Sequence, residues 1–251
     1  SAHNDELAML GRIHTYEQFL ASYQTAREAG FRNINIDLIS AIPGQTLHSY
    51  LDTLERVLKC RPEHISSYSL IVEDGTPLAE DTVLLAKLPD EETDREMYEA
   101  TRKVLEMSGY KRYEISNYAK PGFACRHNIG YWKRTDYLGF GPSAASLFGN
   151  RRWTNTADRS LYLKACGALE KIREDEETLS RQDAMEEFMF LGLRMTQGIS
   201  TAEYEEKFGK EIHAVYGGVL KKYEAMHLLQ EHSGRRALKR EGISVSLYLI
   251  N

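Results

Sequence analysis

The stretch Asn33-Ile-Asn-Ile-Asp-Leu-Ile39, followed by Ile42-Pro-Gly-Gln-Thr46, carries the pattern that decides the fold. Apolar residues at 34, 36 and 38 alternate with polar ones, which predicts a half-buried strand. After the Pro-Gly turn, leucines at 47, 51, 54 and 58 share one helical face, so we expect a helix up to about Cys60. The segment therefore predicts one strand, a turn and one amphipathic helix.

Further elements flank this unit on both sides. Before the strand, Thr15-Tyr-Glu-Gln18 is a capping box, which predicts that a helix begins there and ends near Gly30. Arg61-Pro62 ends the second helix, and His64 to Ile71 is typical of a second strand. The alternation of helices and strands favours right-handed crossovers and a parallel sheet.

The middle of the chain is more irregular. Residues 72–100 hold ten Asp/Glu and two Lys/Arg, which we interpret as a solvated loop and the start of a helix over Asp90–Met107. Residues 113–119 are a candidate strand, and residues 147–154 predict a hairpin around Gly149-Asn150.

The last third is dominated by helical periodicity. Ser180 is the predicted N-cap of a helix that closes at Gly198, and the capping box Ser200–Glu203 opens a second helix that ends at Gly209. A third helix is expected over about 211–230, followed by a wing strand at 235–238. These elements predict a small winged-helix-like domain over about 176–251.

Composition limits the classes of function. The chain has 251 residues and a net charge of −5, without the basic patch that nucleic-acid binding requires. No apolar run approaches the length of a membrane helix, and no secretory signal is visible, so we expect a cytoplasmic protein. Three widely spaced cysteines, Cys60, Cys125 and Cys166, favour a reducing compartment and cannot by themselves form an iron–sulfur site.

Two β/α units are too few to close a parallel barrel. We therefore expect residues 1–75 to be the last β/α units of a partial barrel whose opening strands lie outside this chain. Residues 76–175 would extend the barrel, and residues 176–251 would form the winged-helix-like domain.

Several motifs occur in a fixed order and carry a family resemblance. They are Leu10–Thr15, Asn35–Thr46, His64–Leu70, Tyr113–Ala119, Cys125-Arg-His-Asn-Ile-Gly-Tyr-Trp132 and Tyr137-Leu-Gly-Phe-Gly-Pro-Ser-Ala-Ala-Ser146. The set resembles the radical S-adenosylmethionine proteins related to oxygen-independent coproporphyrinogen III oxidase, and in particular their heme chaperones. The resemblance implies an α/β fold, the carboxy-terminal part of a partial (β/α) barrel with a small winged-helix-like domain, and a family-specific domain over 180–245.

The resemblance also implies cofactors. The family holds a 4Fe–4S cluster through a CxxxCxxC motif, which this chain lacks, and we therefore predict that the chain alone does not cleave S-adenosylmethionine. Arg12, Asp37, Ile71 and Ala145 fall at positions that bind S-adenosylmethionine in the family. The alternative for Arg12 is a solvated surface arginine, and that for Asp37 is a helix-capping or ion-paired carboxylate. For Ile71 and Ala145 the alternative is tight packing of a loop on the barrel.

The HNxxYW pattern at 127–132 resembles the one that distinguishes the heme chaperones. It implies that His127 binds heme iron while Tyr131 and Trp132 pack on the macrocycle, with Cys125 as a second possible ligand. Without the resemblance, a single histidine of this kind is more often a structural residue.

The predicted function is heme binding and transfer to an acceptor hemoprotein, such as a respiratory one that could be membrane-associated. The alternative from the same family is oxidative decarboxylation of coproporphyrinogen III in porphyrin biosynthesis. A third hypothesis, DNA binding by the winged-helix-like end, is disfavoured because the segment Ala202–Lys207 is acidic where a recognition helix would meet phosphate.

Overall fold

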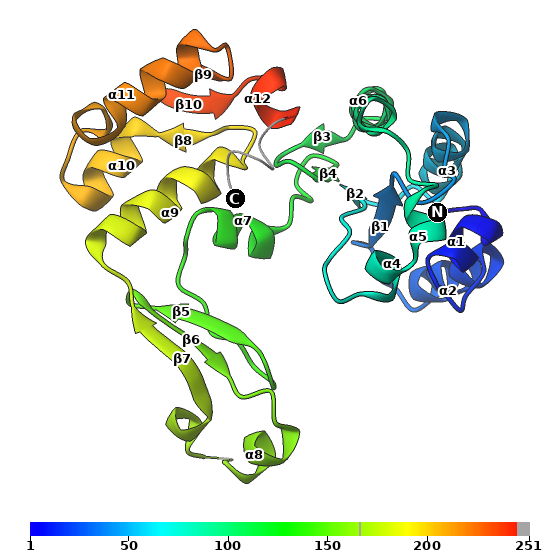
Figure 1. Ribbon diagram of the computed structural model, residues 1–251, viewed down its shortest axis with the longest axis horizontal. Coiled ribbons are helices and arrows are strands. Elements are labelled where there is room, and N and C mark those ends of the chain that lie inside the picture. The colour runs from blue at the N-terminus through cyan, green and yellow to red at the C-terminus, as the bar shows by residue number, and fades with distance from the viewer. Residues whose placement is uncertain (166, 245–251) are drawn as a thin grey trace. The chain divides into compact units, whose positions relative to one another are not determined.

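A computed structural model describes residues 1–165 and 167–244 (Figure 1). It divides into two compact units, Ser1–Cys125 and Arg126–Asn251, which we describe separately. Cys166 lies outside the described residues.

The first unit contains one four-stranded sheet and six helices. The strands are ordered β1-β2-β4-β3 across the sheet, which leaves β1 at one edge. The helices are α1 (Asn4–Met9), α2 (Tyr16–Glu28), α3 (Leu47–Lys59), α4 (Pro77–Glu80), α5 (Thr82–Leu85) and α6 (Glu91–Met107); the strands are β1 (Asn35–Ser40), β2 (His64–Ser69), β3 (Lys111–Arg112) and β4 (Asn117–Ala119).

The predicted parallel sheet is confirmed for its first two strands. β1 and β2 run parallel, with Asn35 opposite His64 and Asp37 opposite Ser66. The candidate strand at 113–119 is confirmed over Asn117–Ala119, where β4 runs antiparallel to both β2 and β3. The connection between β3 and β4 is too short for a crossover helix, and a short connection permits only antiparallel pairing.

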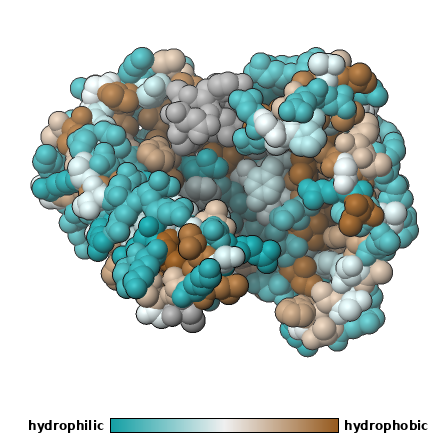
Figure 2. All heavy atoms as spheres, turned by 60° about the horizontal axis from the view of Figure 1, so that its bottom comes forward, coloured by the Kyte–Doolittle hydropathy of each residue, from teal (hydrophilic) through white to brown (hydrophobic). Residues whose placement is uncertain are grey.

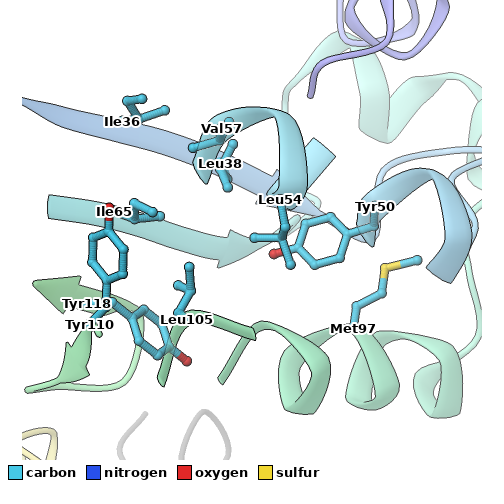
Figure 3. Packing of buried hydrophobic residues seen from close by; sticks show 10 residues of the cluster. All are labelled: Ile36, Leu38, Tyr50, Leu54, Val57, Ile65, Met97, Leu105, Tyr110 and Tyr118. Atoms are coloured by element: carbon cyan, nitrogen blue, oxygen red, sulfur yellow. The ribbon is translucent and has the colours of Figure 1, made fainter. Parts of the chain in front are cut away.

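The sheet packs one apolar face against α3 and α6 (Figure 3). Ile36 and Leu38 of β1 are buried, as the alternating pattern predicted, and Leu54 of α3 is fully buried. Each such side chain stabilises the fold by roughly 1.5–3 kcal/mol. The other buried members of this core are Tyr50, Val57, Ile65, Met97, Leu105, Tyr110 and Tyr118.

The predicted helix starts are confirmed. Thr15 caps α2 and Thr46 caps α3, each through a reciprocal capping box, and Asp90 caps α6. These caps satisfy backbone N–H groups that a helix leaves unpaired in its first turn. They fix where α2 and α3 begin and thereby the direction in which the chain enters and leaves β1.

The described residues of the second unit form two three-stranded sheets and a set of helices. One sheet has the order β5-β6-β7 and the other β8-β10-β9. Its elements are α7 (Arg126–Trp132), β5 (Ala145–Phe148), β6 (Arg151–Asn155), α8 (Arg159–Lys164), a 3₁₀ turn (Leu169–Ile172), β7 (Arg173–Thr178), α9 (Arg181–Leu193), β8 (Ile199–Ser200), α10 (Thr201–Phe208), α11 (Ile212–Ala225), β9 (Leu229–His232), β10 (Arg235–Leu238) and α12 (Arg240–Ser244).

The end of this unit has the predicted three helices and wing. Ser180 caps α9, and Gly209 ends α10 in the left-handed conformation with φ of 58°. The third helix stops at Ala225, earlier than expected, because residues 229–232 pair with β10 instead of continuing the helix. A separate core of buried side chains, including Met185, Tyr204 and Phe208, holds α9, α10 and α11 together.

Within the described residues, no helix is both long enough and apolar enough to cross a membrane. The face seen in Figure 2 is mainly hydrophilic, with hydrophobic residues scattered among polar ones.

Candidate functional site

A cavity of about 260 Å³ lies beside the edge strand β1 in the first unit. Arg12 and Asp37 both line it, together with apolar and aromatic side chains. The cavity thus places a cation and an anion beside an apolar wall. The remaining lining residues are Ser1, Leu7, Leu10, His14, Tyr16, Phe19, Ile36, Leu38, Ile39 and Val57.

Asp37 is exposed on the face of β1 opposite the buried Ile36 and Leu38. Its Oδ1 accepts a hydrogen bond of 2.6 Å from the side-chain amide of Asn35. No ion pair joins Asp37 to the part of the chain that the structure describes, and it caps no helix there. The structural alternatives considered for this carboxylate therefore find no support in its contacts.

The other two candidate residues for S-adenosylmethionine do not line this cavity. Ile71 follows β2 and is exposed, and Ala145 begins β5 in the second unit. The glycine-rich segment beside Ala145 is tightly packed, since a Cβ on Gly139 would lie 2.2 Å from the carbonyl oxygen of Ala145. Packing within the loop thus explains the glycine at 139, whereas a Cβ on Gly141 would meet no atom within 4 Å.

Three aromatic rings of the second unit form a series at α7. His127 and Tyr131 lie one turn apart on the helix, with ring centroids 4.7 Å apart and nearly perpendicular planes. Tyr131 makes the same kind of contact with Tyr137, again at 4.7 Å. His127 is exposed, and no hydrogen bond from another described residue occupies its ring nitrogens. The imidazole is therefore oriented by a ring contact while its nitrogens remain available to a ligand.

Trp132 points to a different environment from the other two residues of its motif. The guanidinium of Arg194 lies 4.4 Å from the indole ring, and the buried indole N–H has no partner among the described residues. Trp132 lines a cavity of about 540 Å³, whose rim includes Lys133, Lys207 and Arg235. The helix thus brings His127 and Tyr131 together but turns Trp132 toward this cavity.

A buried ion-pair network anchors the end of α7. Glu187 of α9 accepts hydrogen bonds from Arg134 at 2.6 Å and from Arg152 at 2.5 Å. Glu187 and Arg134 are both buried, so removal of Glu187 would leave the charge of Arg134 buried without this partner. The network fixes α7, which carries the aromatic series, to α9 and β6.

The described residues contain no group of three or more His, Cys, Asp or Glu side chains that could hold a metal ion. Burial raises the pKa of the Cys60 thiol, which disfavours the thiolate needed for metal binding. Cys125 is a free, half-buried cysteine at the end of the first unit. These residues do not fit a 4Fe–4S cluster.

Comparison with known proteins agrees with the motifs. Residues 179–245 match the family model of the HemN C-terminal domain. The chain is 39% identical to the heme chaperone HemW of Lactococcus lactis over 85% of this chain and 56% of that protein. It is 35% identical to HemW of Bacillus subtilis over 95% of this chain and 63% of that protein. The chain therefore spans less than two thirds of these relatives.

A solved structure supports the fold assignment. Coproporphyrinogen III oxidase (HemN) of Escherichia coli, described as a radical SAM enzyme, matches 99% of this chain and 61% of its own length with a TM-score of 0.77 and 20% identity. The chain thus has the α/β fold of the corresponding part of HemN, with a HemN-type carboxy-terminal domain. Its sequence relationship to the HemW heme chaperones, expected from the ordered motifs, is confirmed.

Sequence reasoning proposed Arg12, Asp37 and His127 as candidates and did not single out two residues behind Asp37. Asn35 contacts Asp37, and His64 of the neighbouring strand contacts Asn35. The signal was the i, i+2 spacing of Asn35 and Asp37, which places both side chains on one face of a strand.

Proposed function

We propose that the protein is a cytoplasmic heme chaperone that binds heme through α7 and passes it to an acceptor hemoprotein. The observation that carries this proposal is the exposed His127 imidazole, packed edge-on against Tyr131, with no competing hydrogen bond among the described residues. The similarity to proteins named heme chaperones supports it.

The chemistry of this helix suits heme. A neutral imidazole nitrogen binds heme iron, and aromatic rings pack on a flat macrocycle. Cations suit the two propionates of heme, and Lys133, Lys207 and Arg235 line the cavity beside Trp132, where they outnumber the two carboxylates of Glu203 and Glu206. A ligand held by one exposed imidazole can also leave, which is what a carrier must allow.

We further propose that Arg12 and Asp37 hold S-adenosylmethionine in the cavity beside β1. A guanidinium suits its carboxylate, a carboxylate suits its ammonium or ribose hydroxyl groups, and the apolar wall suits its uncharged parts. When bound to a reducing cluster, this cofactor supplies radical chemistry. Because the described residues do not fit such a cluster, no step of the proposed function passes through it.

Hemin titration tests the heme site. Addition of hemin to the chain is expected to give a Soret band. In His127→Ala, the apparent affinity for hemin should fall at least about tenfold, since loss of an iron ligand removes more than about 1.4 kcal/mol of binding free energy. His232→Ala is the matched control, because His232 is an exposed histidine of the same unit. Equal weakening in both variants, or no Soret band, would remove the proposal.

Transfer and catalysis are separated by two further assays. Incubation of the hemin-loaded chain with an apo-hemoprotein is expected to move the Soret band to the spectrum of the acceptor. Anaerobic incubation with coproporphyrinogen III and S-adenosylmethionine is expected to give no decarboxylated product. Decarboxylation by this chain would instead establish the oxidase activity.

A further inference from the structure

The polar face of the first sheet carries a hydrogen-bonded series behind Asp37. Asn35 donates from Nδ2 to Asp37 Oδ1 at 2.6 Å, and its Oδ1 lies 2.7 Å from Nδ1 of His64. The other ring nitrogen of His64, Nε2, lies 2.9 Å from the hydroxyl of Tyr113. Ser66 donates to the same Asn35 oxygen at 3.2 Å. These hydrogen bonds therefore connect Tyr113, through His64 of β2 and Asn35 of β1, to Asp37, which lines the cavity.

The order of donors in this series follows from the carboxylate. An ionised carboxylate only accepts hydrogen bonds, so the Asn35 nitrogen must face Asp37 and its oxygen must face His64. His64 must then donate from Nδ1, and in the neutral ring Nε2 carries no proton and accepts from the Tyr113 hydroxyl. His64 is only 5% exposed, and burial lowers its pKa, which is consistent with this neutral form.

We infer that Asn35 is a positioning residue for Asp37, locked in orientation by His64 and Ser66, and that it fixes the carboxylate toward the ligand in the cavity. This inference rests on the proposed binding of S-adenosylmethionine there. Asn35 and Asp37 are exposed on the face of β1 opposite its buried apolar residues, so their contact contributes little to the core. A carboxylate that is held in place before binding loses less conformational entropy when the ligand arrives.

Nuclear magnetic resonance tests the series without any ligand. In the ¹⁵N-labelled chain, His64 is expected to be the neutral form protonated at Nδ1, whereas the exposed His48 serves as a reference for an unconstrained ring. Asp37→Ala is expected to shift the side-chain amide signals of Asn35. Protonation of His64 at Nε2 alone, or Asn35 signals that Asp37→Ala leaves unchanged, would overturn the inference.

Affinity for S-adenosylmethionine, measured by equilibrium dialysis, tests the consequence. Asn35→Ala and His64→Leu are each expected to weaken binding about tenfold, as for loss of support to a charged hydrogen-bonding group. His64→Asn retains a donor near the position of Nδ1 and should restore most of the affinity, which a purely structural role of the ring would not allow. Wild-type affinity in Asn35→Ala, with an unchanged melting temperature, contradicts the inference.

Failure of the proposed cofactor site gives a different result. If the unmodified chain binds no S-adenosylmethionine, the proposed occupant of the cavity is wrong. The resonance experiment then decides by itself whether Asn35 holds Asp37.

Discussion

Gly139 illustrates how one residue type permits two interpretations that only atomic positions separate. From the sequence, the small residues at 139–145 suited either a ligand or tight packing. In the structure, the space where a Cβ of Gly139 would lie is taken by the carbonyl oxygen of Ala145 and the Cβ of Ala144. The packing within the loop therefore requires glycine at this position, whether or not a ligand lies nearby.

Gly139→Ala is expected to destabilise the second unit by about 1–3 kcal/mol, because the added methyl group overlaps backbone atoms. Gly218→Ala is the matched control, since no atom lies within 4 Å of its Cβ position inside α11. That change should stabilise the helix by roughly 0.5–1 kcal/mol. Urea unfolding of both variants measures the difference, and equal stabilities would contradict the packing interpretation.

His64 gives a prediction for pH. Burial lowers its pKa in the folded chain below the value near 6.5 of an unfolded histidine. On acidification the unfolded state therefore binds the proton first, and stability from neutral His64 is lost as the pH falls from about 6.5 toward the folded pKa. The free energy of unfolding between about pH 7 and pH 5 should decrease less in His64→Asn than in the unmodified chain. An identical decrease in both proteins would show that His64 does not contribute.

At the scale of elements, local signals were sufficient where they concern neighbouring residues. The capping box at Thr15, the alternation along β1 and the Gly149-Asn150 hairpin are contacts within a few residues, and all were predicted. The direction of β4 was not, because it depends on how far the chain travels after α6. The end of α11 was not predictable either, because it depends on the pairing of residues 229–232 with β10, which lies later in the sequence.

Loss of the α2 cap tests the element scale. Thr15→Ala is expected to reduce the stability of the first unit by about 1 kcal/mol, because the backbone N–H of Gln18 loses its acceptor. Ser22→Ala in the same helix is the control, since Ser22 is exposed and bonds only to the carbonyl of Gln18 in the preceding turn. Thermal unfolding should separate the two variants. A control as unstable as the cap variant would rule out the capping explanation.

At the scale of the whole molecule, sequence motifs located both candidate sites but not their contacts. Arg12 and Asp37 lie 25 positions apart, and only the fold of α1 and β1 brings them to one cavity. The separation of Trp132 from the face of His127 and Tyr131 follows from helical geometry, since residues five positions apart do not share a face. The Asn35–His64 contact required the strand register, which no local pattern sets.

Each unit has its own core, which predicts independent folding. The buried members of one core all lie within Ser1–Cys125, and those of the other all lie within the second unit. Residues 1–125 and 126–251, produced separately, should each unfold cooperatively in calorimetry. A chain of residues 1–107, which lacks β3 and β4, is the control and should not. Loss of cooperativity in both halves would contradict this division.

The position of β1 at the edge of its sheet has a consequence for isotope exchange. The carbonyl groups of Ile34 and Ser40 bond to the β2 side, so the even-numbered residues of this strand face β2 and the backbone amides of Asn35, Asp37 and Ile39 face away from it. Those three amides should take up deuterium much faster than the amides of Ile36 and Leu38. Any polypeptide that pairs with β1 as an additional strand would slow deuterium exchange at these three amides selectively, so their exchange rates would report strand addition.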